Sequence, residues 1–281
     1  MNLLKEASLI LSDKQIAVIR FIIKQCYIPH FKNPRSLSEK INYIKLYNRN
    51  PLRELVADRL KVRNYVVQKC PSINFPTVYW HGIDFNKDIW DSLPEKFVIK
   101  ANHGSNMVKI INKSKISFNE IVPVLNKWLN RDYSRYGREW FYKKLDKYII
   151  AEEMLINENI SPPDFKFFVL NGKCEFIQID TNRFTNHKRN LYTVAFEEMD
   201  VRLVYPPWCD NIKKPKIFEK AVSTAEKLAV DFDFIRVDLY LLNNEIYFGE
   251  LTNMPENGFG KFTPKSFDFD MGSKLPKKIL R

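Results

Sequence analysis

Residues 234–253 read FIRVDLYLLNNEIYFGELTN, and the fold expected for the chain follows from this stretch. Two runs of β-branched, aromatic and aliphatic residues flank Asn243-Asn244, a pattern typical of a β-hairpin. Each run has an acid in its interior, Asp238 in the first and Glu250 in the second. Because an acid is costly to bury alone, the pair indicates either a bound cation such as Mg²⁺ or a structural pair neutralised by Arg236 or a lysine.

The alternation of side chains along the two strands tests whether these acids meet. Glu250 and Thr252 share one face of the second strand. A three-residue loop at 243–245 would place Asp238 opposite Glu250, whereas a two-residue turn would place Asp238 opposite Gly249 and the acids on opposite faces. A β-bulge is the other way to bring the acids together. We expect the odd-length loop, with both acids and Thr252 on one face.

Length and composition exclude several classes of protein. The chain of 281 residues is 45% hydrophobic and 14% aromatic, which is typical of a globular protein with a large core. Its four cysteines are scattered without a CxxC pair, which favours free thiols in a reducing compartment over a zinc site. Charged residues interrupt the N-terminal segment, and no apolar run approaches the ~20 residues of a membrane span. We therefore expect a cytoplasmic protein.

The net charge of +12 is strongly basic. Such a charge attracts polyanions, including nucleic acid, an anionic membrane face, nucleotide phosphates or an acidic polysaccharide. The basic residues are spread along the chain, so part of the charge is also consistent with ordinary solvated surface.

The pattern of elements divides the chain into three regions. The first ~70 residues are helical and basic, short strands and an amphipathic helix follow from Pro71 to residue 155, and the remainder contains two hairpins and a helix. Hairpins outnumber strict strand–helix–strand units, so we predict an α+β fold built on antiparallel sheets.

Candidate phosphate-binding residues follow one of the predicted strands. Lys100 ends an apolar strand and precedes the polar turn Asn102-His103-Gly104-Ser105, where backbone N–H groups can hold a phosphate. A lysine that only extends to solvent is the alternative. Lys166 alternates with phenylalanines inside a strand, and a covered lysine needs an anion.

Two further polar groups could contact ligands. Glu152 and Glu153 follow the apolar run YIIA and could receive ribose hydroxyls, or they could simply end the strand. Arg183, His187 and Arg189 lie in a predicted polar loop and could clamp a carboxylate or phosphate, or remain solvated.

The order of these segments resembles the ATP-grasp superfamily, and within it the teichuronopeptide-biosynthesis (TupA-like) family. Seven segments spread over residues 33–275 carry the resemblance: NPRSLSEKINYIKLY, VADRLKVRNYV, KFVIKANHGS, IIAEEML, DFKFFVLNGK, FIRVDLYLLNNEIYFGELT and GFGKFTP. The resemblance implies an ATP-grasp fold, in which two antiparallel-sheet lobes grip ATP after a helical N-terminal segment. It gives a helical region at 1–75, a central lobe at 76–155 and a C-terminal lobe with the metal-binding hairpin at 156–281.

The resemblance also implies a role for each matching residue. Arg236 would stabilise the transferred phosphoryl group or the tetrahedral intermediate, and Lys166 would reach into the ATP site. Mg²⁺ would be held by Asp238 and Glu250, with Thr252 where the family usually has asparagine; Asn253 could serve only through a bulge. ATP would be contacted by Lys61, Lys100, His103, Gly104, Ser105, Glu152, Glu153, Met154 and Leu155.

The implied activity is that of an ATP-dependent, ADP-forming carboxylate–amine ligase that works through an acyl phosphate. The family is associated with cell-surface polysaccharide synthesis, so the expected partners are an anionic glycan or activated sugar carboxylate and an amine. Arg183, His187 and Arg189 would bind that acceptor. Peripheral association with the anionic membrane face is compatible with the charge, and nucleic acid is not an expected partner.

Two other function classes compete with the ligase. A glycosyltransferase could use Asp268-Phe269-Asp270 as a D-x-D metal motif, but that triplet lies in a terminal tail. A nucleic-acid-binding module is indicated only by the net charge, and its binding would collapse as salt rises.

Overall fold

The computed structural model describes residues 11–155, 164–181, 186–209 and 212–276. The first described elements are helices, as predicted. Their bounds are α2 (Asp13–Gln25), α3 (Leu37–Tyr47), α4 (Pro51–Ala57) and α5 (Lys61–Lys69). Asp58 ends α4, and its Oδ1 accepts the backbone N–H groups of Leu60 and Lys61 at the start of α5. None of the described helices has the length and apolarity needed to cross a membrane.

A four-stranded antiparallel sheet follows these helices. Its strand order is β1-β4-β2-β3. The helix α7, whose apolar stripe packs against the sheet, provides most of the helical cover of its core. The elements of this part are β1 (Val78–Gly82), α6 (Lys87–Ser92), β2 (Lys96–Ala101), β3 (Val108–Asn112), α7 (Phe118–Leu129), α8 (Tyr133–Gly137), the 3₁₀ helix η1 (Trp140–Tyr142) and β4 (Ile149–Glu152).

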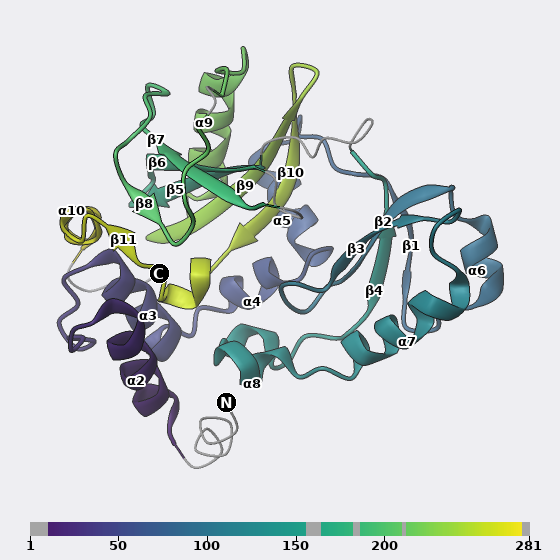
Figure 1. Ribbon diagram of the computed structural model, residues 1–281, viewed down its shortest axis with the longest axis horizontal. Helices are drawn as coiled ribbons and strands as arrows, with labels where there is room; N and C mark the ends of the chain where they lie inside the picture. The colour runs from purple at the N-terminus through teal and green to yellow at the C-terminus, as the bar shows by residue number, and fades with distance from the viewer. Residues whose placement is uncertain (1–10, 156–163, 182–185, 210–211, 277–281) are drawn as a thin grey trace.

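A five-stranded antiparallel sheet forms the second layer, in the order β10-β9-β5-β6-β7. Figure 1 shows it beside the four-stranded sheet, with helices α2 and α3 on its other side. A short β8–β11 pair and helix α10 lie on the same side of the sheet as α2 and α3. The elements are β5 (Asp164–Leu170), β6 (Lys173–Thr181), β7 (Lys188–Tyr192), β8 (Arg202–Leu203), α9 (Phe218–Leu228), β9 (Phe234–Leu242), β10 (Glu245–Thr252), η2 (Pro255–Gly258), β11 (Phe262–Thr263) and α10 (Ser266–Ser273).

Two cores cover the two faces of the five-stranded sheet. Residues such as Phe167 and Val237 pack with α5 and α9 on one face. On the other face, Phe168 and Phe234 pack with α3 and α10. Strand alternation accounts for this division, since neighbouring residues point to opposite faces.

The structure confirms the α+β fold and corrects some element predictions. The Asn171-Gly172 turn joins β5 and β6 with φ of 50° and 79°, as expected for a tight hairpin. Residues 188–192, expected in a polar loop, instead form β7 at the edge of the sheet. The expected terminal tail contains α10.

Candidate active site

A strip of charged residues crosses one face of the five-stranded sheet beside the apolar core. Alternation places Lys166 of β5, Asp180 of β6 and Asp238 of β9 on the same face as Phe168, Phe176 and Phe234. Lys166 and Asp238 are 3% and 4% exposed. A buried strip of this kind must neutralise its own charges, because unpaired buried charges are strongly unfavourable.

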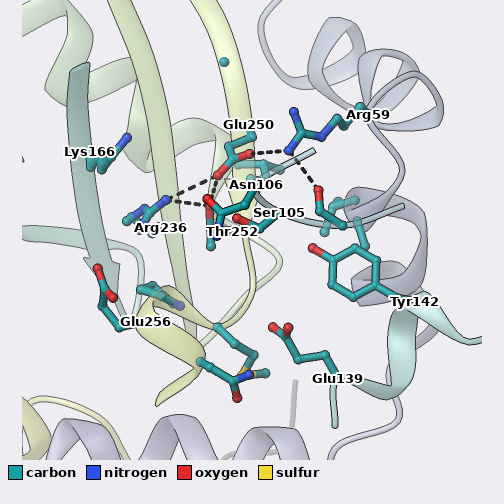
Figure 2. Close-up of a pocket in the computed structure, with 18 of the residues that line it drawn as sticks. Arg59, Ser105, Asn106, Glu139, Tyr142, Lys166, Arg236, Glu250, Thr252 and Glu256 are labelled. Atoms are coloured by element: carbon teal, nitrogen blue, oxygen red, sulfur yellow. Dashed lines mark hydrogen bonds and ion pairs between the residues drawn. The ribbon is translucent and has the colours of Figure 1, made fainter. Parts of the chain in front are cut away.

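The strip opens into a cavity of about 460 Å³ between the two sheets. The turn 104–106 between β2 and β3 contributes one wall, and Lys166, Arg236, Glu250 and Thr252 contribute another. Figure 2 shows these side chains around the same space, with Arg59, Tyr142 and Glu139 on the opposite side. Of the predicted site residues, the cavity is lined by Gly104, Ser105, Lys166, His187, Arg189, Arg236, Glu250 and Thr252.

Arg59 links the two walls of the cavity, and the sequence analysis did not select it. Its Nη2 donates to the carbonyl oxygen of Gly104 at 3.0 Å and lies 3.6 Å from Oε2 of Glu250. Burial by itself would raise the pKa of Glu250, but Arg59 and Arg236 lower it to about 2. The sequence contains a signal for Arg59, because this residue lies in the segment VADRLKVRNYV, two residues from Lys61, which was predicted to contact ATP.

Asp238 and Glu250 lie opposite each other on the hairpin, as expected, but a β-bulge rather than a three-residue loop places them there. Asn243 and Asn244 form a two-residue turn with φ of 52° and 60°, so the predicted three-residue loop was wrong. The register shifts between Phe248 and Glu250, and Glu250 consequently pairs with Asp238. A β-bulge at Gly249 therefore brings the acids together.

The faces of the last strand residues are confirmed. The hydroxyl of Thr252 donates to Oε1 of Glu250 at 2.8 Å, so Thr252 shares the face of the acids. Asn253 points the other way and exchanges hydrogen bonds with Arg53 at 2.9 and 3.1 Å.

Asp238 is neutralised by two cations of this chain. Nε and Nη2 of Arg236 donate to its two carboxylate oxygens at 2.7 Å each, and Nζ of Lys166 lies 2.9 Å from Oδ2. Lys166 also contacts Asp164. The structural alternative weighed from the sequence, an acid pair neutralised by Arg236 or a lysine, is therefore what the side chains form.

The residues still suit Mg²⁺ that arrives with a phosphate. Glu250 and Thr252 line the cavity and offer oxygen donors that Mg²⁺ prefers, while Asp238 lies opposite Glu250 with both oxygens bound by Arg236 and Lys166. Three acids face three cations here, since Arg59, Lys166 and Arg236 contact Asp164, Asp238 and Glu250. A polyphosphate would add negative charge to this balanced set, and a divalent cation would offset it. Among the described residues, no group of three or more His, Cys, Asp or Glu is already arranged as a metal site.

Several predicted ATP-binding residues lie outside this cavity. Lys61 is half exposed and pairs with Asp146 at 3.2 Å. Lys100 pairs with Glu152, which also lies 3.4 Å from Arg63, and burial lowers the pKa of Lys100. The remaining predicted contacts outside the cavity are His103, Glu153, Met154 and Leu155.

His103 and Glu153 already have hydrogen-bond partners within the protein. Both ring nitrogens of His103 have partners, Oδ1 of Asn102 at 3.1 Å and the carbonyl oxygen of Trp128 at 3.0 Å, and burial lowers its pKa. Glu153 accepts from the backbone and hydroxyl of Thr77 at 3.0 and 2.9 Å. Their roles here are to fix the turn after β2 and the end of β4.

The predicted acceptor residues reach the cavity but do not form an open clamp. Arg189 is 4% exposed and binds Asp180 through Nε at 2.6 Å and through Nη2 at 3.1 Å, with Glu256 at 2.8 Å from Nη1. His187 lies 3.3 Å from Asp180 and stacks on Tyr205. Arg183 lies outside the described residues.

The D-x-D triplet has a structural use. Asp268 is 2% exposed, and its Oδ1 accepts from the backbone N–H of Ser38 at 2.9 Å and from the Ser38 hydroxyl at 3.1 Å. It therefore ties α10 to the first turn of α3. Because Asp268 is buried in this contact, the D-x-D triplet does not support the glycosyltransferase interpretation.

Comparison with known proteins gives the class and then the family. Residues 39–276, most of the chain, match the family described as TupA-like ATPgrasp. The protein is an ATP-grasp protein by fold. It belongs to the TupA-like ATP-grasp family. No curated protein matches the sequence.

Solved structures of ATP-grasp proteins are similar at low identity. D-alanine–D-alanine ligase from Bacillus anthracis, complexed with ATP, is 15% identical with a TM-score of 0.41, over 71% of this chain and 54% of that one. The Helicobacter pylori D-alanine–D-alanine ligase is 15% identical with a TM-score of 0.41, over 79% and 62%. An ADP complex of the N5-carboxyaminoimidazole ribonucleotide synthetase purK is 14% identical with a TM-score of 0.45, over 82% and 53%. The chain thus spans between half and two thirds of the length of these structures.

Proposed function

We propose that this protein is an ATP-dependent carboxylate–amine ligase that forms an amide and releases ADP and phosphate. The observation that carries the proposal is the cavity between the two sheets, where Arg59, Lys166 and Arg236 surround a backbone turn and the acid Glu250. Fixed cations around backbone donors suit a phosphoryl group that gains charge as it moves.

The chain's own residues supply position and charge. Arg236 is held by Asp238, and Lys166 is held by Asp164 and Asp238, so both cations are already positioned before the phosphoryl group arrives. Asp238, Glu250 and Thr252 would hold Mg²⁺, which offsets charge on the phosphates.

The reaction proceeds in two steps under this proposal. An oxygen of the acceptor carboxylate attacks the γ-phosphorus of ATP, the bond to ADP breaks, and an acyl phosphate forms. The amine nitrogen then attacks the acyl carbon, and inorganic phosphate leaves with the electron pair of the C–O bond. Holding both reactants in one cavity makes each step effectively intramolecular.

We further propose that the carboxylate is a uronic acid or an amino-acid side chain in the synthesis of a cell-surface polysaccharide, such as capsule, O-antigen or teichuronopeptide. Membership of the TupA-like family supports this class, and a net charge of +12 suits an acidic glycan at the cytoplasmic face of the membrane. Arg189 and His187, which line the same cavity, would orient that acceptor.

The test is a screen of uronic acids and amino acids against amines with ATP and Mg²⁺, in which ADP, phosphate and the amide are measured. ADP release that requires both a carboxylate and an amine would support the ligase. Release of AMP and pyrophosphate would contradict the acyl-phosphate mechanism, and turnover of a sugar nucleotide without ATP would favour a glycosyltransferase.

A further inference from the structure

Glu139 is an acid in the same cavity that the proposed chemistry has not used. It lies between α8 and η1, and it is 6% exposed while still lining the cavity. Figure 2 shows its carboxylate directed into the space below Tyr142, on the side away from Lys166. Sequence reasoning did not select it, because nothing in the local pattern distinguishes it from a surface glutamate.

The carboxylate of Glu139 has no hydrogen bond or ion pair within 4.0 Å among the residues that the structure describes. The cation whose field reaches it is Lys45, but Nζ of Lys45 donates to the backbone and side-chain oxygens of Asn257 at 2.8 and 2.6 Å. An isolated buried carboxylate is unfavourable. Its presence beside a cavity indicates a ligand that supplies the missing donors.

The carboxylate of Glu139 lies close against Gly137. A Cβ added to Gly137 would lie 2.5 Å from Oε2 of Glu139 and 2.6 Å from Nδ2 of Asn257. Any side chain at position 137 would displace the acid from its present position.

The wall around Glu139 suits a cation. The rings of Tyr133 and Tyr142 line the cavity and meet edge to face with centroids 5.1 Å apart. Burial and the field of Glu139 raise the pKa of Tyr133 to about 12, so the phenol stays neutral. Aromatic faces beside a carboxylate attract alkylammonium groups.

The cavity is therefore positively charged at one end and negatively charged at the other. Lys166, Arg236 and Arg59 lie at one end, where an anion would bind, and Glu139 lies at the other. Tyr142 lies between the two ends (Figure 2), and burial together with the fields of Glu139 and Glu250 raises its pKa. A ligase that joins an anion to an amine needs this separation of charge.

We propose that Glu139 binds the ammonium group of the amine substrate and accepts its proton before the nitrogen attacks. This proposal rests on the ligase function. One N–H bond of the ammonium breaks and an O–H bond forms on the carboxylate of Glu139. The neutral nitrogen then bonds to the acyl carbon, and the leaving phosphate takes the second proton, giving the amide and hydrogen phosphate. Burial raises the pKa of Glu139 to about 7 against the opposing field of Lys45, which suits a base at neutral pH.

The first test measures binding of ethylammonium, a probe that needs no turnover, by saturation-transfer NMR. We expect the wild-type protein to bind it and Glu139→Gln to bind it at least tenfold more weakly, while affinity for ATP is unchanged. The matched control is Glu197→Gln, an exposed glutamate outside the cavity. Gly137→Ala displaces the carboxylate without removing it, so it should also weaken binding of ethylammonium. This variant provides the test if Glu139→Gln does not fold.

The second test separates this role from the ligase itself. Hydroxylamine is uncharged at neutral pH and needs no base, so Glu139→Gln should still form hydroxamate from the acyl phosphate while losing amide formation with a cationic amine. Wild-type affinity for ethylammonium in both Glu139→Gln and Gly137→Ala, or no binding by the wild type, would overturn the proposal and leave Glu139 as the counter-ion of Lys45. Absence of any ADP release would sink the ligase but not the ammonium site.

Discussion

Glu250 lies directly opposite Asp238 across β9 and β10, although the turn that joins these strands has only two residues. The bulge at Gly249 accounts for the pairing. A Cβ at Gly249 would lie 2.9 Å from the carbonyl oxygen of Asp238, so only glycine fits this close approach without a shift. The acids at the centre of the proposed site thus depend on one residue that has no side chain.

The two acids should respond differently to loss of charge. Asp238 is buried against Arg236 and Lys166, so Asp238→Asn leaves this buried cluster one negative charge short and should lower the free energy of unfolding by about 3–5 kcal/mol. Glu250 has a 37% exposed side chain, so Glu250→Gln should change stability little but abolish ATP turnover. Urea unfolding and ADP release measure the two effects. Equal destabilisation by both variants would contradict this distinction.

Arg59, rather than Lys61, should be the phosphate-binding cation of the first region. Arg59 contacts both Gly104 and Glu250, whereas Lys61 is half exposed and pairs with Asp146. We expect Arg59→Ala to weaken binding of ATP with Mg²⁺ at least tenfold by calorimetry. Lys61→Ala is the control from the same segment, and a larger loss of ATP affinity in that variant would restore the assignment made from the sequence.

Lys166 should contribute to folding as well as to the site. Because it is 3% exposed between Asp164 and Asp238, Lys166→Met should lower the free energy of unfolding by about 3–5 kcal/mol. Adding Asp164→Asn removes one of the two acids that lose Lys166 as a partner and should recover about 1–2 kcal/mol of that loss. Chemical denaturation of the single and double variants measures this coupling, and strict additivity would show that the two side chains do not interact.

The stability of the protein should depend on Asp268 in acid. Burial raises the pKa of Asp268 to about 6, and the side-chain and backbone hydrogen bonds of Ser36 and Ser38 only partly oppose it. The folded state therefore binds a proton that the unfolded state releases above pH ~4. The contribution of this group to stability is greatest below that pH and is lost as pH rises towards 6, by up to about 3 kcal/mol.

Asp268→Asn should remove that slope, because the amide oxygen can still accept from Ser38 while carrying no charge. Urea unfolding at several pH values between 4 and 6.5 measures it. Asp270→Asn, at an exposed residue of the same triplet, is the control and should keep the wild-type slope. A slope unchanged in Asp268→Asn would assign the pH dependence to other groups.

Local patterns in the sequence determined most of the secondary structure. The period-two alternation of residues 234–253 and 164–180 favours the two hairpins, and it also places Arg236 and Asp238 on one face, because successive strand residues point to opposite sides of a sheet. The Asn171-Gly172 turn is fixed by the same local chemistry. Ordered motifs then gave the ATP-grasp family, which the family match confirms.

Only the tertiary structure decided which charged side chains meet. Lys100 is paired with Glu152 and Arg59 reaches Glu250, although each belongs to a segment that also offers other charged residues. Glu139 enters the cavity from a segment with no recognisable motif. Such contacts depend on the packing of distant elements and on a single bulge, and no local period in the sequence encodes either. The sequence therefore determined the strands and their faces, whereas packing determined the partners of each charge.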